Sequence, residues 1–95
     1  MADQWDTQSI DLDHLPSKED TSSVLSTLSE GQATAFNKTA REVREWTQSI
    51  QNGFFGVALT PLRALGFIRD RSRQNNLEPE MMPALAAYWQ RLINR

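Results

Sequence analysis

The chain has 95 residues, of which 39% are hydrophobic and 23% charged, and its formal net charge is −2 at pH 7. This length fits one small domain, and the absence of cysteine excludes disulfide and thiolate chemistry. The first residues lack the basic and apolar regions of a secretory signal, so we expect a cytoplasmic or virion-associated protein.

Charge is divided unevenly along the sequence. Residues 1–20 carry six acidic side chains and one lysine, a net charge of −5, whereas residues 21–95 carry nine basic and six acidic side chains, a net charge of +3. An acidic segment joined to a basic body suggests electrostatic contact, either within the chain or with a partner. A solvated tail that keeps the protein soluble explains the same pattern equally well.

Residues 1–20 are predicted to form an extended, acidic, largely non-helical arm ahead of a single small helical domain at 21–95. Apolar and acidic residues alternate in this arm, so that Ile10 and Leu12 fall on one side of an extended chain. Such a segment is suited to a groove or a sheet edge, although packing across its own helices is the commoner fate. Trp5 is expected to anchor the arm, because an exposed tryptophan is costly in water.

A long helix is predicted over residues 28–52. The preceding run 21–27 is rich in serine and threonine, whose hydroxyls compete for backbone hydrogen bonds, and is expected to form at most a short helical turn. Either Ser29 or Thr27 fits as the first residue of a capping box. The apolar stripe of the helix repeats at spacings of three and four and comprises Phe36, Ala40, Val43, Trp46 and Ile50.

The stretch from Phe54 to Ile68 is apolar, but it is too short and too often interrupted to span a bilayer. Gly53 is expected to end the long helix in a left-handed conformation, and Thr60 with Pro61 to begin a second helix that ends at residue 74. The predicted apolar face of this second helix comprises Leu62, Leu65 and Ile68, with Phe67 at its edge.

A third helix is predicted over residues 80–94, with Pro79 or Pro83 in its first turn. The chain is therefore predicted to be all-α, with one long and two shorter helices in a helical hairpin or a three-helix arrangement. The connection 54–59 carries two phenylalanines that so small a domain does not easily cover, and exposed patches of this kind mark contact surfaces. The apolar stripe of the third helix comprises Met82, Leu85, Trp89 and Leu92.

No pattern typical of catalysis or metal binding is present in the sequence. His14 is the only histidine, and together with Asp11 and Asp13 it makes too small a set for a metal site. The glycines match no phosphate-binding loop, and the serines and threonines lack a paired base. We therefore expect a protein without enzymatic activity, cofactor or metal.

The favoured function is that of a non-enzymatic protein–protein interaction module, a small adaptor or assembly component that associates with itself or with another protein. A viral or phage structural accessory, or a chaperone, has this size and composition. Aromatic and arginine side chains dominate protein interfaces. The residues expected to meet a partner are Trp5, Ile10, Leu12, Phe54, Phe55, Val57, Arg69, Arg71 and Arg73.

Two other functions fit parts of the sequence. The basic cluster from Arg63 to Arg73 suggests nucleic-acid binding, although the sequence pI of 5.3 disfavours it. On a helix, Arg69 and Arg73 share a face while Arg71 points about 200° away, so the three converge only in an extended chain. The stretch Phe54–Ile68 alternatively suggests a segment that lies in a membrane interface, with the arginines that follow its aromatic pair against anionic lipid.

Overall fold

The computed structural model describes residues 4–53 and 56–94, and these form helices and loops without a strand. The all-α class predicted from the sequence is therefore confirmed for the described residues. The radius of gyration of the Cα atoms is 12.9 Å. In chain order the elements are η1 (Thr7–Ser9), α1 (Lys18–Thr27), α2 (Glu30–Gln51), α3 (Pro61–Gln74), η2 (Pro79–Met81) and α4 (Met82–Ile93), where η denotes a 3-10 helix.

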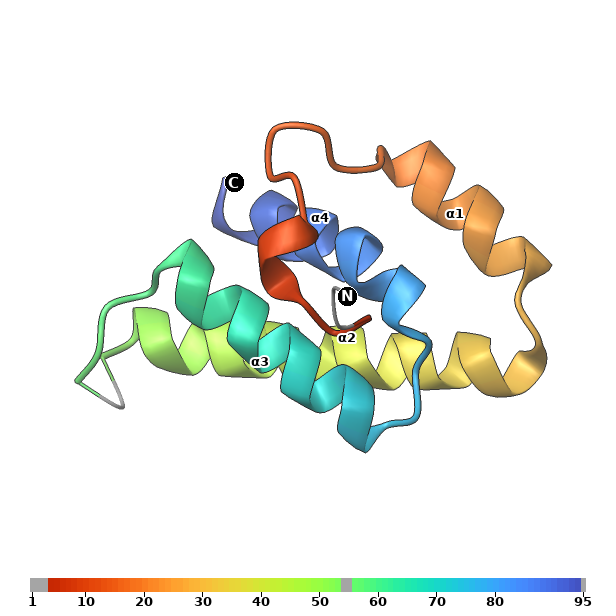
Figure 1. Ribbon diagram of the computed structural model, residues 1–95. Helices are drawn as coiled ribbons and strands as arrows, with labels where there is room; N and C mark the ends of the chain where they lie inside the picture. Colours follow the sequence, from red (N-terminus) through yellow and green to blue (C-terminus); the bar gives the residue numbers. More distant parts are fainter. Residues whose placement is uncertain (1–3, 54–55, 95) are drawn as a thin grey trace.

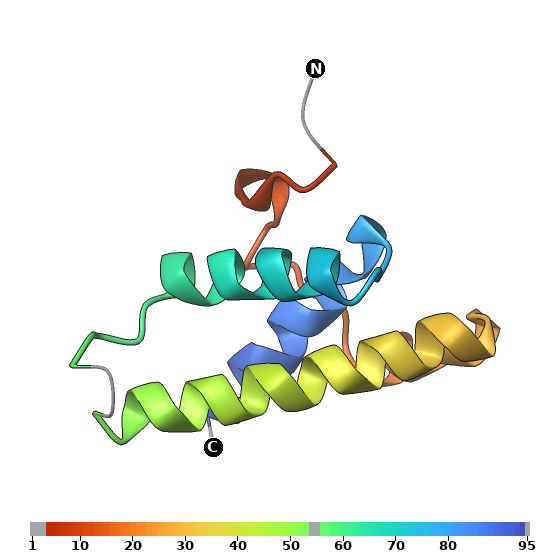
Figure 2. The same cartoon turned by 90° about the horizontal axis from the view of Figure 1, so that it is seen from below.

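Helices α2 and α3 form an antiparallel pair (Figure 1), and Figure 2 shows them side by side. Helix α4 packs against both of them, and α1 packs against α4. The N-terminal segment that contains η1 contacts α3, and in Figure 2 it lies across α3 from α2. Among the described residues, α4 therefore packs on one side of the α2–α3 pair.

The core lies where α2, α3 and α4 meet. The predicted stripes supply most of it, since each helix turns its apolar residues toward the other two. Trp46 and Leu92, which the sequence also assigns to these stripes, are only half-buried. The buried members of the stripes are Phe36, Val43, Ile50, Leu65, Ile68, Met82, Leu85 and Trp89.

Leu62 is wrongly predicted to lie on the buried face of α3, because its side chain is 77% exposed. The buried residues of α3 are Ala64, Leu65, Ile68 and Ser72. At 100° per residue, Leu62 lies about 100° around the helix from the centre of that set. The rotation of α3 is set by its packing against α2 and α4, which the spacing of the three predicted residues does not reveal.

The prediction of at most a short helical turn over residues 21–27 is wrong, because Lys18–Thr27 form the helix α1. A capping box begins this helix: the Ser17 hydroxyl accepts a hydrogen bond from the Asp20 N–H (3.0 Å), and the Asp20 carboxylate accepts one from the Ser17 N–H (3.4 Å). Thr21 is the only residue of α1 that is buried. The capping box, rather than a buried apolar stripe, is therefore the main sequence feature that favours this helix.

The extended acidic arm is not confirmed. Two of its aspartates cap local turns instead: Asp6 accepts a hydrogen bond from the N–H of Gln8 (2.9 Å), and Asp11 accepts one from the N–H of Asp13 (2.9 Å). These turns bend the segment and bring its apolar side chains onto the core. The side chains of this segment that pack there, all half-buried, are Trp5, Ile10, Leu12 and Leu15.

The ends of α2 and α3 agree with the prediction because their capping residues act locally. The hydroxyls of Ser29 and Thr60 each accept a hydrogen bond from the N–H three residues later, at 3.2 Å in both cases. Gly53 follows α2 with φ of 74°, a conformation that glycine adopts without strain. Of the two capping boxes left open by the sequence, the one at Ser29 supplies the cap.

Helix α3 ends in a Schellman motif. Asn76 has φ of 58°, its N–H donates to the carbonyl of Arg73 (3.1 Å), and the N–H of Leu77 donates to the carbonyl of Ser72 (2.9 Å). Leu77 is buried, which anchors the chain as it turns toward α4. The motif fixes the position of the preceding residue, Asn75, at the end of α3 beside α2.

Candidate functional site

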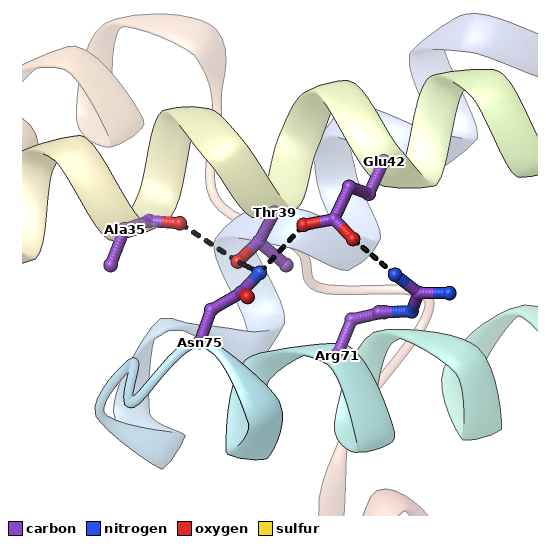
Figure 3. Close-up of polar contacts among 5 residues, drawn as sticks. All are labelled: Ala35, Thr39, Glu42, Arg71 and Asn75. Atoms are coloured by element: carbon purple, nitrogen blue, oxygen red, sulfur yellow. Dashed lines mark hydrogen bonds and ion pairs between the residues drawn. The ribbon is translucent and has the colours of Figure 1, made fainter.

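A chain of hydrogen bonds joins the C-terminal end of α3 to α2 (Figure 3). The Thr39 hydroxyl donates to the carbonyl of Ala35 (2.8 Å) and accepts from Nδ2 of Asn75 (2.9 Å), and the same Nδ2 donates to Oε1 of Glu42 (2.9 Å). Both partners of Asn75 need a donor, so its amide group presents the NH2 to them. Asn75 is thereby held in one orientation between two residues of α2.

An ion pair and two aromatic contacts extend this chain of hydrogen bonds. We call the whole set of contacts, from Thr39 to Trp46 on α2 and from Phe67 to Asn75 on α3 and its cap, the α2–α3 seam. Arg71 donates from Nη1 to Oε2 of Glu42, and its guanidinium lies 5.0 Å from the ring centroid of Phe67. The Phe67 ring in turn stacks on Trp46, with ring centroids 4.7 Å apart and an interplanar angle of 14°. Polar and aromatic contacts therefore fix α2 and α3 relative to one another along their shared surface.

The pKa of Glu42 lies below its ordinary value. Burial by itself raises the pKa of this carboxyl, but the hydrogen bonds from Asn75 and Arg71, and the positive charges of Arg71 and Lys38, more than offset that effect. The carboxylate form is therefore the form that stabilises the α2–α3 seam.

This lowered pKa predicts an acid-sensitive contribution to stability. Because the folded pKa is below the ordinary value of 4.5, the contribution of Glu42 is present above that pH and is lost as the pH falls through the folded value. We expect the difference in free energy of unfolding between wild type and Glu42→Gln to shrink between about pH 6 and pH 3 in urea titrations. The control is Glu45→Gln, on an exposed side chain of the same helix. A difference that stays constant with pH argues against a stabilising Glu42 carboxylate.

Beside the aromatic pair, α2 and α3 leave an open depression of about 430 Å³, which we call the α2–α3 depression. Apolar side chains from both helices and from the connection between them line most of it. Arg63 and Asp70 on α3 supply its charged groups, and Gly66 lies between them in the sequence. The apolar lining comprises Trp46, Ile50, Val57 and Phe67.

Gly66 lies in the middle of α3, where glycine costs about 0.5–1 kcal/mol relative to alanine. The positive-φ residues among those described are Gly53, Gly56 and Asn76, so the backbone at Gly66 does not need glycine. A Cβ built on Gly66 meets no atom within 4 Å, so packing among the described residues does not need it either. A bare backbone beside an open depression is what the close approach of another molecule requires.

Gly66→Ala should therefore stabilise the isolated domain, by about 0.5–1 kcal/mol, because it removes the entropic cost of glycine without a clash. Urea denaturation of the two proteins at low concentration measures the difference. Gly53→Ala is the matched control and should destabilise the domain, since its φ of 74° strains any residue with a side chain. If Gly66→Ala is destabilising, this glycine serves the fold of the chain itself.

The structure places the apolar residues that the sequence assigns to a partner in different surroundings. Trp5, Ile10 and Leu12 are half-buried against the core of their own chain. Val57 is 36% exposed and lines the α2–α3 depression. The predicted contact residues at positions 54–55, Phe54 and Phe55, lie outside the described residues.

The last three of the four arginines in the predicted basic cluster, Arg69, Arg71 and Arg73, do not converge. Arg69 pairs with the neighbouring Asp70 (3.1 Å), Arg71 is turned toward α2, and the guanidinium of Arg73 lies 5.4 Å from the ring centroid of Trp5. Residues 61–74 are helical, and the helix directs Arg71 away from the other two, as helical spacing requires. Each of these arginines thus has a contact within the chain.

Of the seven described residues around the depression, six are missing from the set that the sequence assigns to a protein partner, and only Val57 belongs to both. The sequence assigns Trp46 and Ile50 only to a helix stripe, and its patterns attach no function to Gly66 or Asp70. The available signal is Gly66 itself, since a glycine inside a helix is unfavourable unless a contact needs it. Which side of the helix it faces depends on the rotation of α3, which only the fold defines.

Metal-binding clusters and membrane-spanning helices are both absent from the described residues outside the seam and the depression. His14 Nδ1 lies 2.7 Å from Oδ2 of Asp11 on an exposed turn, and no group of three or more possible metal ligands occurs within residues 4–53 and 56–94. None of the helices in these two ranges has the length and apolar character needed to cross a membrane. Comparisons with models of protein families, with curated proteins and with solved structures give no match for this chain.

Proposed function

We propose that this chain is a non-enzymatic protein-interaction module that binds an amphipathic helix in the α2–α3 depression. The observation that carries the proposal is Gly66, a helix-interior glycine that faces an open apolar depression and is not needed by the packing of the described residues. Exposed apolar surface of this kind marks contact sites in small domains. A small adaptor or assembly component is the kind of protein that this surface fits.

A helix is the occupant that suits the shape and the charges. Helices α2 and α3 lie side by side (Figure 2), and residues of both line the depression. A third helix can pack into such a groove through apolar residues at helical spacing. Arg63 and Asp70 are seven residues apart on α3, about 10.5 Å along the helix axis, or two turns. A bound helix with charges two turns apart would meet both, which fixes its direction.

The hydrogen-bonded seam supports this function because it holds the two helices of the groove at a fixed distance. Glu42 accepts hydrogen bonds from Arg71 and Asn75, which belong to the opposite helix and its cap (Figure 3). A groove fixed before binding loses little conformational entropy when the partner arrives. In this proposal these residues are positioning residues and do not themselves touch the partner.

Selection of displayed helical peptides tests the proposal. Amphipathic helices of 14 residues, the length of α3, would be selected on the wild-type protein and then titrated against Gly66→Leu, which fills the depression. We expect apolar residues at helical spacing in the enriched peptides, and binding to Gly66→Leu that is weaker by about tenfold or more.

Arg44→Glu is the control, because Arg44 is exposed on α2 and does not line the depression. Circular dichroism checks that each variant keeps its helix content. The proposal fails if no peptide is enriched on the wild type, or if enriched peptides bind Gly66→Leu as tightly as they bind the wild type.

Nucleic acid and membrane surfaces, the two alternatives, have weaker support. Arg71 points away from Arg69 and Arg73, and each of the three has a contact within the chain, whereas phosphate binding favours a clustered basic patch. The membrane alternative depends mainly on Phe54 and Phe55, which lie outside the described residues. Salt-sensitive retention on immobilised DNA, or sedimentation with anionic vesicles, would count in favour of these alternatives.

A further inference from the structure

We infer that the helix bound in the α2–α3 depression is α3 of a second copy of this chain, antiparallel to the first and crossing it near Gly66. The inference rests on the proposed function and adds the identity of the occupant. It depends on three properties of α3: the symmetry of its charges, the face on which they lie, and their availability for new contacts.

The charges of α3 are arranged symmetrically. Arg63 and Asp70 each lie three and a half residues from the midpoint between Gly66 and Phe67, about 5 Å along the helix axis on either side. Two antiparallel copies that cross at this midpoint place each Arg63 opposite Asp70 of the other copy. Parallel copies in register place Arg63 opposite Arg63. The pattern is therefore complementary to itself in one direction only, as a two-fold interface requires.

These residues also share one face of α3. At 100° per residue, Arg63, Gly66 and Asp70 fall within about 60° of one another. They lie on the side opposite the buried residues Ile68 and Ser72. Gly66 is the residue at the crossing point, where the absence of a side chain lets two helix backbones approach closely. The face thus combines a bare centre with opposite charges at its two ends.

Both charges are available for a second copy. Arg63 has no ion-pair partner among the described residues. Asp70 pairs with Arg69, but the two side chains are 37% exposed for Arg69 and 66% exposed for Asp70, and pairs so exposed contribute little to stability. Exchanging that contact for one with the partner's Arg63 therefore costs little, while the second copy's Asp70 gives Arg63 a partner that it lacks among the described residues.

The size of the contact sets the expected strength. One helix crossing another buries less surface than the roughly 1,200–2,000 Å² typical of stable complexes, and interfaces below that range are transient. We therefore expect a reversible dimer that forms in the micromolar range or above. Its population must be measured over a wide range of concentration.

Charge reversal at the two ends of the face tests the inference by sedimentation equilibrium. Wild type should change from monomer to dimer with rising concentration. Arg63→Glu places two acidic residues opposite each other at both ends of the pair, and Asp70→Arg places two basic ones there. Each single variant should dimerise at least about tenfold more weakly than the wild type. Arg44→Glu, away from the depression, should leave dimerisation unchanged.

Two rescues make the test specific to the antiparallel pairing. The double variant R63E/D70R restores opposite charges at both ends, so it should dimerise with itself about as strongly as the wild type. An equimolar mixture of the two single variants should form a heterodimer. At one end of that heterodimer the introduced glutamate faces the introduced arginine, and at the other end the unchanged Asp70 faces the unchanged Arg63. All of these substitutions are at the surface, and circular dichroism confirms the fold of each variant.

The inference is overturned if the wild type remains monomeric at every concentration, or if charge reversal leaves a wild-type dimer unchanged, or if neither rescue restores association. These outcomes differ from a failure of the proposed function. A monomeric wild type that still binds selected helical peptides in a manner dependent on Gly66 retains the docking groove and excludes only the second copy as its occupant.

Discussion

Trp89→Ala should lower the free energy of unfolding by about 3–5 kcal/mol, the largest effect we expect from a single substitution in this chain. Trp89 is 2% exposed and lies in α4, which packs against both α2 and α3. Removing the indole leaves a cavity where the three helices meet. Because domains of this size are stable by only about 5–15 kcal/mol, the variant should be largely unfolded at mild urea concentrations, as measured by circular dichroism.

Two further variants control this result. Leu62→Ala removes a side chain that is 77% exposed, and its effect should stay within about 0.5 kcal/mol. Trp89→Phe should lower the free energy of unfolding by less than Trp89→Ala. The buried indole N–H has no hydrogen-bond partner among the described residues, so removing it leaves no acceptor group unpaired. If Leu62→Ala is as damaging as Trp89→Ala, then α3 does not turn Leu62 toward solvent and its rotation must be revised.

Asn75→Asp should destabilise the domain by about 2–4 kcal/mol at neutral pH. The substitution removes both hydrogen bonds that the amide donates, to Thr39 and Glu42, and sets a second carboxylate beside Glu42. Like charges at this distance raise the pKa of one carboxyl, so part of the lost stability should return as the pH falls below about 5. Urea titrations at several pH values measure both effects.

Asn76→Asp is the matched control for this substitution. Asn76 is the next residue, is exposed, and has φ of 58°, a conformation that aspartate tolerates better than most residues. Its cost should be under about 1 kcal/mol, mostly from a negative charge near a helix C-terminus. Equal losses from the two variants would mean that the α2–α3 seam contributes little to stability.

Local signals in the sequence are sufficient to predict most helix ends. Ser29, Thr60 and Gly53 act through hydrogen bonds or backbone conformations within a few residues, so their effect is visible without the fold. Helix α1 is not predicted, because its serine and threonine hydroxyls compete for backbone hydrogen bonds and so disfavour a helix. In the structure the capping box at Ser17 outweighs that effect. The sequence shows both the capping box and the hydroxyl side chains, but it does not show which of the two has the larger effect on helix stability.

The seam and the depression cannot be predicted in the same way. Asn75 and Glu42 are 33 residues apart, and nothing in their local sequence shows that they meet. Leu62 and Phe67 illustrate the same limit, since the rotation of α3 about its axis decides which of them faces solvent. Spacing identifies an apolar stripe, but tertiary packing decides which residues of that stripe stay exposed.

Gly66 connects the sequence to the proposed function most directly. The chain keeps a residue that weakens α3, at a place where the packing of the described residues gives no reason for it. Gly66→Ala should stabilise the monomer, and its new side chain at the crossing point should weaken the dimer. Opposite effects on folding and association are characteristic of a residue that serves an interface.

Amide spectra of the wild-type protein recorded between about 20 µM and 1 mM test the dimer most directly, since this range spans the affinity expected for so small an interface. We expect resonances to shift with concentration around the α2–α3 depression, at Trp46, Gly66, Phe67 and Asp70, while those of α1 stay constant. Spectra that do not change with concentration, or shifts confined to α1 and α4, would contradict docking of a second copy on this surface.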